Sequence, residues 1–168
     1  MSSPFSTGTG CPGLAFLLAQ VGAHAAAKFA ERLEPLKLTP AHAGILRAIS
    51  AEPGISQQQL AAWLGMFPSR LVLVLDELER AGLLQRKALP SDRRTYALQL
   101  TAKGRDKLQA IGRLARDHQE KLCAALSAGE QETLAALLSR IAGEQHLTPG
   151  VHPGYRQLGR RRKGGCLP

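Results

Sequence analysis

Aromatic residues are scarce in this sequence of 168 residues: Phe, Trp and Tyr make up 4% of it, although 44% of the residues are hydrophobic. The core must therefore consist mostly of Leu and Ala side chains. Such a core favours helices packed on helices over a β-sandwich, whose strands are enriched in β-branched and aromatic residues. The chain is long enough to bury this core within one domain.

Cysteines and long apolar runs are scarce as well. The three cysteines provide no framework of paired disulfides, which favours a reducing compartment. The longest strictly apolar runs, at 14–19 and 71–75, fall far short of the roughly 20 residues that a transmembrane helix needs. We therefore expect a cytoplasmic protein without a membrane span.

Acidic residues are outnumbered by basic ones. The 13 Asp and Glu residues oppose 22 Lys and Arg residues, which gives a formal net charge of +9. Much of the surplus lies in residues 147–168, which contain no acid. A basic surplus is consistent with a nucleic-acid partner, because each neutralised phosphate releases counterions. It fits a solvated tail without a role equally well.

Two helices are predicted before residue 53. Apolar residues recur at helical spacing over 14–34, and Pro35 ends this first helix because proline disfavours helical geometry in the residue before it. Thr39 then caps a second helix that starts at Pro40. Pro53-Gly54 ends it.

A helix-turn-helix follows. Ser56 opens an S-x-x-Q capping box for a helix over residues 57–64, which Gly65 ends. Pro68 starts the next helix, which runs to about residue 81. A turn of about three residues between two such helices is typical of the helix-turn-helix motif.

The pattern then changes from helical to alternating. Residues 83–88 and 95–100 predict two short strands, joined by a turn over 89–94. Two strands with a basic turn after a helix-turn-helix form a wing. The predicted fold class is therefore mainly α with a small β-wing.

The remaining helices flank this winged unit. Thr101 caps a long helix over residues 102–126, and an S-x-x-E capping box at Ser127 begins a last helix that runs through Ile141. Together with the first helix, they have apolar faces that the winged unit alone cannot cover. Such faces suit a dimer interface.

Three motifs follow one another in this chain: Leu-Glu-Arg-Ala-Gly-Leu at 78–83, Asp-Arg-Arg at 92–94 and Leu-Thr-Ala-Lys-Gly at 100–104. In this order and spacing they resemble the signature of the MarR family of bacterial winged-helix transcription regulators. The resemblance implies a homodimer that grips a pseudo-palindromic DNA duplex. It also implies a small-molecule or redox input that changes the spacing of the two winged lobes.

The resemblance covers about residues 14–145, within an expected winged-helix domain over 14–146. Outside it, composition predicts a disordered N-terminal arm over residues 1–13 and a basic disordered tail over residues 147–168. Within the domain, the DNA-binding lobe spans about 38–101, and the dimerisation helices span about 14–34 and 102–145. The tail is either a non-specific DNA arm or a solvated segment.

The resemblance places DNA contacts at the start of the fourth helix and at the tip of the wing. Ser69 and Arg70 lie in the first turn of that helix, where Arg70 would bind a guanine edge or a phosphate. Asp92 is expected to orient Arg94, which with Arg93 would enter the minor groove. The alternative for this group is a surface ion pair of about 0–1 kcal/mol.

Further DNA contacts are expected from four polar residues: Gln57, Gln58, Arg86 and Lys87. Val72 and Leu73 depart from the family pattern, which commonly has Thr and Arg at these places. Either they meet thymine methyl groups, or base reading is confined to the start of the helix.

The input site has two sets of candidates. Five residues are candidates for binding a small aromatic or anionic ligand: His24, His42, Trp63, Met66 and His118. Cys11 and Cys123 are the candidates for thiol or peroxide sensing, although nothing cationic near Cys11 in the sequence would lower its pKa. The histidines have no metal-ligand spacing, so neither a metal nor a cofactor is expected.

No phosphate-binding Gly-rich loop, G-x-S-x-G motif or metal-binding carboxylate pair is present, so an enzyme is not expected. The sequence predicts a dimeric, sequence-specific DNA-binding transcription regulator, a repressor released by a small-molecule ligand. Two alternatives remain open: a thiol-sensing repressor of the same fold, and an architectural protein that binds DNA without sequence preference.

Overall fold

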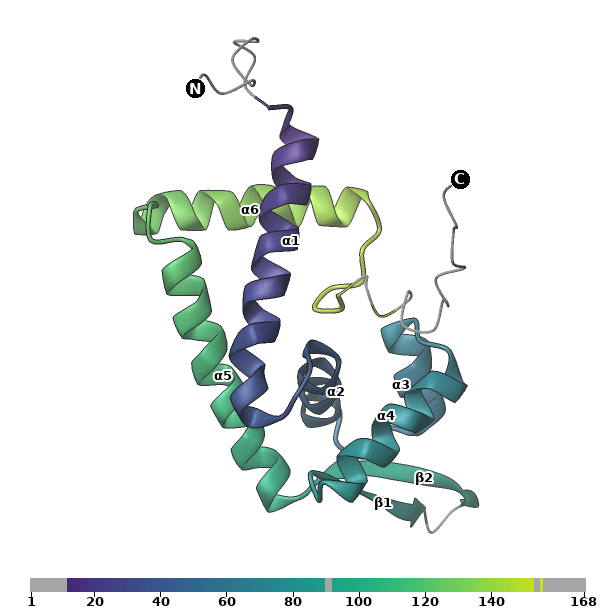
Figure 1. Cartoon of the computed structure of the whole chain (residues 1–168). Helices are drawn as coiled ribbons and strands as arrows, with labels where there is room; N and C mark the ends of the chain where they lie inside the picture. Colours follow the sequence, from purple (N-terminus) through teal and green to yellow (C-terminus); the bar gives the residue numbers. More distant parts are fainter. Residues whose placement is uncertain (1–11, 90–91, 153–154, 156–168) are drawn as a thin grey trace, which may run out of the picture.

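The computed structural model describes residues 12–89, 92–152 and Tyr155, with the backbone alone at Leu89 and 92–95. In chain order, the elements are α1 (Leu14–Leu33), the 3-10 turn η1 (Glu34–Leu36), α2 (Pro40–Ala51), α3 (Gln57–Leu64), α4 (Pro68–Arg80), β1 (Leu84–Leu89), β2 (Asp92–Leu100), α5 (Ala102–Leu122) and α6 (Ala128–Glu144) (Figure 1). The predicted fold class, mainly α with a small wing, is confirmed.

Side-chain caps begin the helices where the sequence predicts them. The Ser56 hydroxyl accepts a hydrogen bond from the backbone N–H of Gln59, and the Gln59 side chain accepts one from the N–H of Ser56. Ser127 and Glu130 form the same reciprocal pair at the start of α6. Each box satisfies two N–H groups that the helix itself leaves without a partner.

The core is aliphatic, as the composition predicts. Its largest fully buried side chains are those of Leu33, Ile45, Leu46, Ile49, Leu60, Leu71, Leu75, Leu78, Leu84 and Leu98. They come mainly from α2, α3, α4 and the wing. Among the described residues, the one buried aromatic side chain is that of Tyr155, which lies beyond the last helix.

The wing is an antiparallel pair in which Leu84 of β1 lies opposite Leu100 of β2. The chain just before α3 joins it: the N–H of Leu98 donates to the carbonyl of Ile55, and the N–H of Gly54 donates to the carbonyl of Leu98. These bonds attach the wing to the helix-turn-helix. The orientation of the wing is therefore fixed by these backbone hydrogen bonds as well as by packing in the core.

Three predicted boundaries differ from the structure by three residues or more. One is the end of α6, which lies at Glu144 and not at Ile141. β2 begins at Asp92 and not at residue 95, so the backbone of the basic segment belongs to the strand and the expected turn over 89–94 is shorter. α5 ends at Leu122 and not at residue 126. The chain must turn there so that Ser127 can cap α6, and this need overrides the helix propensity of the Ala-rich segment.

α1 packs along α5 (Figure 1). Arg32 of α1 forms an ion pair with Asp117 of α5, and the rings of Phe29 and His118 lie 5.6 Å apart between centroids. Burial is the main cause that lowers the pKa of His118, and the nearby charge of Arg32 lowers it further.

No described helix has the length and apolarity needed to cross a bilayer.

The segment after α6 differs from the expected disordered tail. Residues 147–152 and Tyr155 return to α2, where the Tyr155 hydroxyl donates a 3.1 Å hydrogen bond to the carbonyl of Pro40. Arg47 of α2 donates to the carbonyl of Gly150. Disorder from residue 147 onward is therefore wrong for this first part, and the basic residues 156–168 lie outside the described ones.

Candidate nucleic-acid interface and adjoining cavity

Two of the sequence motifs form a single junction that sets the wing against α4. The N–H of Thr101 donates to the carbonyl of Leu83 over 3.1 Å, and the Thr101 hydroxyl donates to the carbonyl of Gly82 over 2.7 Å. A Cβ added at Gly104 would overlap the carbonyl oxygen of Leu83. The glycine in the third motif is therefore required by how closely α5 approaches the end of α4.

The start of α4 presents the polar side chains that the sequence assigns to DNA. Ser69 and Arg70 are exposed in its first turn, and the N-cap residue Phe67 makes no side-chain cap. Gln57 is half-buried and Gln58 is exposed at the start of α3. These four polar groups are positioned by the two helices of one helix-turn-helix.

Arg86, for which a DNA contact was expected, is instead held by two carboxylates of α4. Its guanidinium donates to Asp76 Oδ1 over 2.6 Å and to Glu79, and its backbone N–H also donates to Glu79. Burial opposes the charge, but Asp76 and Glu79 outweigh it and raise the pKa of Arg86 above its ordinary value. Arg86 therefore attaches β1 to α4, while Lys87 beside it is exposed.

The wing tip is described by its backbone alone. Asp92, Arg93 and Arg94 belong to β2, but their side chains lie outside the described part of the chain. Their expected roles in the minor groove stay predictions from the sequence.

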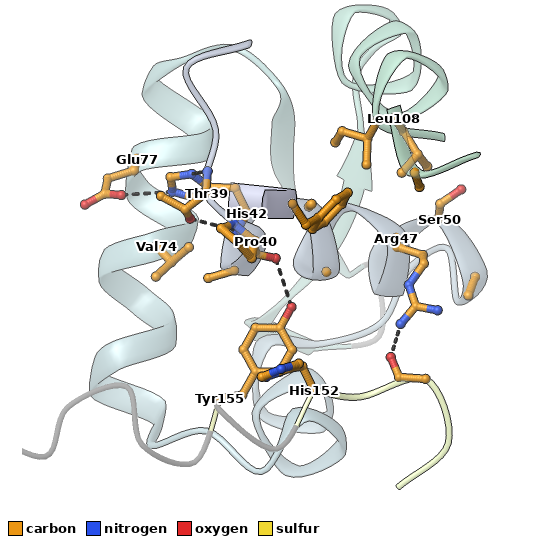
Figure 2. Close-up of a pocket in the computed structure, with 18 of the residues that line it drawn as sticks. Thr39, Pro40, His42, Arg47, Ser50, Val74, Glu77, Leu108, His152 and Tyr155 are labelled. Atoms are coloured by element: carbon orange, nitrogen blue, oxygen red, sulfur yellow. Dashed lines mark hydrogen bonds and ion pairs between the residues drawn. The ribbon is translucent and has the colours of Figure 1, made fainter. Parts of the chain in front are cut away.

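A cavity of about 1160 Å³ lies between α2, α4, α5 and the C-terminal segment (Figure 2). Its apolar lining includes Phe29, Leu73, Val74, Leu108 and Ile111. It also contains three arginines, Arg47, Arg70 and Arg80. A mainly apolar cavity with a few cationic groups suits a ligand with an aromatic ring and an anionic group.

His42 links two walls of this cavity. Its Nδ1 accepts the backbone N–H of Thr39 over 3.1 Å, as part of the capping box of α2. Its Nε2 lies 3.0 Å from Glu77 Oε2 on α4. Because Nδ1 is an acceptor, these bonds assign the ring hydrogen to Nε2, which donates to Glu77. The position of α4 relative to α2 is therefore coupled to a side chain in the cavity wall.

The other four ligand candidates lie in different places. Trp63 lines a smaller neighbouring cavity of about 90 Å³. Met66, in the turn between α3 and α4, is buried in the core at 5% exposure. His24 is exposed on α1 and His118 packs on Phe29, so neither belongs to the described lining. Met66, His24 and His118 do not line this cavity, and ligand contacts from them stay predictions.

The cavity residues beyond α6 were not predicted from the sequence. Gly150, His152 and Tyr155 line the cavity, yet they follow a Pro- and Gly-rich stretch that indicated disorder. A usable signal was Gly44 inside α2, because a glycine in a helical pattern commonly has a packing reason. A Cβ there would overlap the Tyr155 hydroxyl.

The redox candidates stay predictions. Cys11 lies outside the described residues, and Cys123 is a half-buried free thiol at the C-terminal end of α5. Within the described ranges, no group of three or more His, Cys, Asp and Glu side chains could hold a metal ion.

Comparison with known proteins agrees with this geometry. The model of the MarR family matches residues 38–96, from just before α2 to the wing. The chain is 31% identical over 131 residues to the HTH-type transcriptional repressor Rv2887 of Mycobacterium tuberculosis, an alignment that covers 78% of this chain and 94% of that protein.

Solved structures match a similar share of the chain. The repressor CouR bound to a 23-mer DNA duplex has 34% identity and a TM-score of 0.70, covering 77% of this chain and 92% of CouR. Rv2887 in complex with p-aminosalicylic acid has 30% identity and a TM-score of 0.64, covering 78% of this chain and 99% of Rv2887.

Proposed function

Because this chain belongs to the MarR family of transcription regulators, we propose that it is a cytoplasmic, homodimeric repressor that is released from its operator by a small anionic aromatic ligand. One observation carries the proposal: α4 supplies both the exposed first turn of the helix-turn-helix and a wall of the cavity. Arg70 belongs to both. A ligand in the cavity therefore acts on the helix that reads DNA.

The DNA contacts would come from the exposed ends of the winged unit. Ser69 and Arg70 would reach base edges in the major groove, while Gln57, Gln58 and Lys87 would hold phosphates. Asp92, Arg93 and Arg94 would occupy the minor groove from the wing. The DNA-bound structure of CouR supports this use of the fold.

Dimerisation would cover the apolar faces of α1 and α6. On α6, Leu134, Leu137, Leu138 and Ile141 recur at helical spacing and are 39–48% exposed. Phe16 of α1 is 60% exposed. An apolar stripe of this length on an isolated subunit is typical of an interaction surface, and a second copy of the chain would supply the matching stripe.

The ligand would place its ring against the apolar lining and its anionic group toward the arginines. Arg47, Arg70 and Arg80 are the cavity's cationic groups, with Glu77 as the opposing carboxylate. The complex of Rv2887 with p-aminosalicylic acid supports a ligand of this class. We propose no enzymatic activity for this chain.

The test is selection of duplexes from a random library, followed by titration of the enriched sequence at two salt concentrations with and without p-aminosalicylate. We expect a palindrome with half-sites about one helical turn apart, and weaker binding in the presence of the ligand. Binding that is tight, sequence-indifferent and steeply salt-dependent would instead favour the architectural protein.

Arg94→Ala is the variant that is expected to lose DNA binding in this experiment. Removing the guanidinium that is assigned to the minor groove is expected to abolish specific binding while the fold and the dimer persist. Arg113→Ala, which removes an exposed cation of α5 outside the winged unit, is the matched control. Unchanged operator affinity of Arg94→Ala in a gel-shift titration would contradict the assignment.

A further inference from the structure

The segment that follows α6 is attached to α2 at two places. We name residues 147–152 and Tyr155 the C-terminal strap. Arg47 donates to the carbonyl of Gly150, and the Tyr155 hydroxyl donates to the carbonyl of Pro40 (Figure 2). Val151 packs against the core. The strap lies beyond the region that the MarR family model matches.

Tyr155 is the main anchor of the strap. Its side chain is part of the core, and the residue is only 7% exposed. Burial raises the pKa of the phenol, although Arg47 opposes this effect, so the hydroxyl stays protonated and remains a donor at neutral pH. A buried phenol with a satisfied hydroxyl is a stable anchor for a segment that has no helix or strand of its own.

Gly44 provides the place for this phenol. A Cβ at position 44 would overlap the Tyr155 hydroxyl and lie 2.7 Å from Cζ. Gly44 does not have a positive φ, so its backbone does not require glycine. A glycine inside a helix is less favourable than alanine, so its use here indicates that the space over α2 belongs to Tyr155.

The strap also forms part of the cavity. Gly150, His152 and Tyr155 line the large cavity, and Arg47, which the strap holds through Gly150, is one of its three arginines. The strap therefore supplies an aromatic surface and orients a cation. These are the two features that an anionic aromatic ligand requires.

We propose that the C-terminal strap is a wall of the effector site, with Tyr155 as its ligand-contacting residue, and that the strap must be seated on α2 for the cavity to hold an anionic aromatic ligand. This inference rests on the proposed function, because it assigns the cavity to an effector. It adds to that function a specificity-determining segment outside the winged unit.

The seating of the strap is measured by the fluorescence of Trp63, the single tryptophan of the chain. Trp63 lines the small cavity together with Val151 and Tyr155. Gly44→Ala places a methyl group where the phenol lies, and Tyr155→Ala removes the phenol without changing α2. Both are expected to shift the Trp63 emission to longer wavelength, because the indole becomes more exposed to water.

Gly22→Ala is the matched control. It adds the same methyl group to a helical glycine of α1 that does not line the cavity, where the new Cβ would meet nothing within 4 Å beyond the backbone of its own helix. The Trp63 emission of this variant should equal that of the wild type. Circular dichroism checks the fold of all variants, and Tyr155→Ala carries the test if Gly44→Ala does not fold.

The second measurement is the Kd for p-aminosalicylate by calorimetry on the full chain. We expect Gly44→Ala and Tyr155→Ala to bind about tenfold more weakly than the wild type, since a tenfold change equals about 1.4 kcal/mol, the order of one aromatic contact. Gly22→Ala, outside the cavity, should bind with the affinity of the wild type.

Each outcome decides something. If the Trp63 emission shows that the strap has left α2 but the Kd for p-aminosalicylate does not change, the strap is not part of the effector site. An unchanged emission in both variants would show that Tyr155 is not seated on Gly44. If the wild type binds the selected operator but takes up no p-aminosalicylate, the ligand class is wrong, and the role of the strap falls with it. A wild type that selects no DNA contradicts the proposed function itself.

Discussion

At the scale of single residues, the structure gives chemical reasons for positions that the sequence shows only as a pattern. Gly104 is required because α5 begins in contact with the carbonyl of Leu83. The role of Arg86 could not be predicted, because its partners Asp76 and Glu79 lie on the preceding helix and the sequence does not show which side of β1 faces them. The spacing of residues in the sequence identified the motifs, whereas the packing of the folded chain determines what each residue of a motif contacts.

Gly104→Ala tests the junction. The added Cβ overlaps backbone, which cannot move as a flexible side chain can, so we expect the free energy of unfolding to fall by about 1–3 kcal/mol in urea titrations. Gly112→Ala, whose methyl group would have ordinary contacts, should change stability by less than this or increase it. Equal stability of both variants would argue against a tight junction.

Lys87 and Arg86 are neighbours with different expected effects. Lys87→Met should lower the salt dependence of DNA binding by about one phosphate contact for each protomer. Arg86→Met should leave that slope in place and lower the free energy of unfolding by about 1 kcal/mol, a modest value because the ion pairs are partly exposed. The measurements are operator titrations over a salt series and urea unfolding. A slope that falls equally in both variants would return Arg86 to the DNA contacts.

At the scale of elements, the sequence predicts what depends on local signals. Ser56, Thr101 and Ser127 begin α3, α5 and α6 as expected, because each cap satisfies N–H groups within its own first turn. The C-terminal strap has no such signal. It has neither helical nor alternating periodicity, and its Tyr155 packs on Gly44 and Pro40 of α2, more than a hundred residues earlier in the chain.

α6 is the element that depends most on a second copy of the chain, since it has no buried residue among those described. Leu137→Lys places a charge in its apolar stripe, and we expect the dimer Kd to rise by more than about a hundredfold, because the loss occurs twice in a symmetric interface. Sedimentation equilibrium measures it. Ala136→Lys, on the opposite face of α6, is the control, and a stable Leu137→Lys dimer would place the interface elsewhere.

At the scale of the whole molecule, the cavity is lined by residues of α2 and α4 in the winged lobe and by residues of α5, one of the long helices outside it. His42 of α2 and Glu77 of α4 form a hydrogen bond in the lining of the cavity. Arg70, at the exposed start of α4, also lines the cavity. A ligand there contacts elements of both parts. It can therefore change the position of α4 without any contact with DNA.

The basic residues beyond Tyr155 are tested by shortening the chain. A chain that ends at Tyr155 keeps the strap and loses the basic segment, and we expect its salt slope to fall by about 0.9 for each phosphate that the segment neutralises. A chain that ends at residue 146 loses the strap as well, so comparison of the two separates these effects. An unchanged slope after removal of residues 156–168 would make that segment a solvated tail.

Gly44 and Tyr155 also have a consequence for how this protein can evolve. Any side chain at position 44 displaces the phenol, whereas a lineage that loses the C-terminal segment has no further need for the glycine. Such a lineage would gain up to about 1 kcal/mol of helix stability by accepting alanine there. The two positions should therefore change together across related sequences, and a glycine at this place in α2 becomes a marker of descent for the segment that covers it.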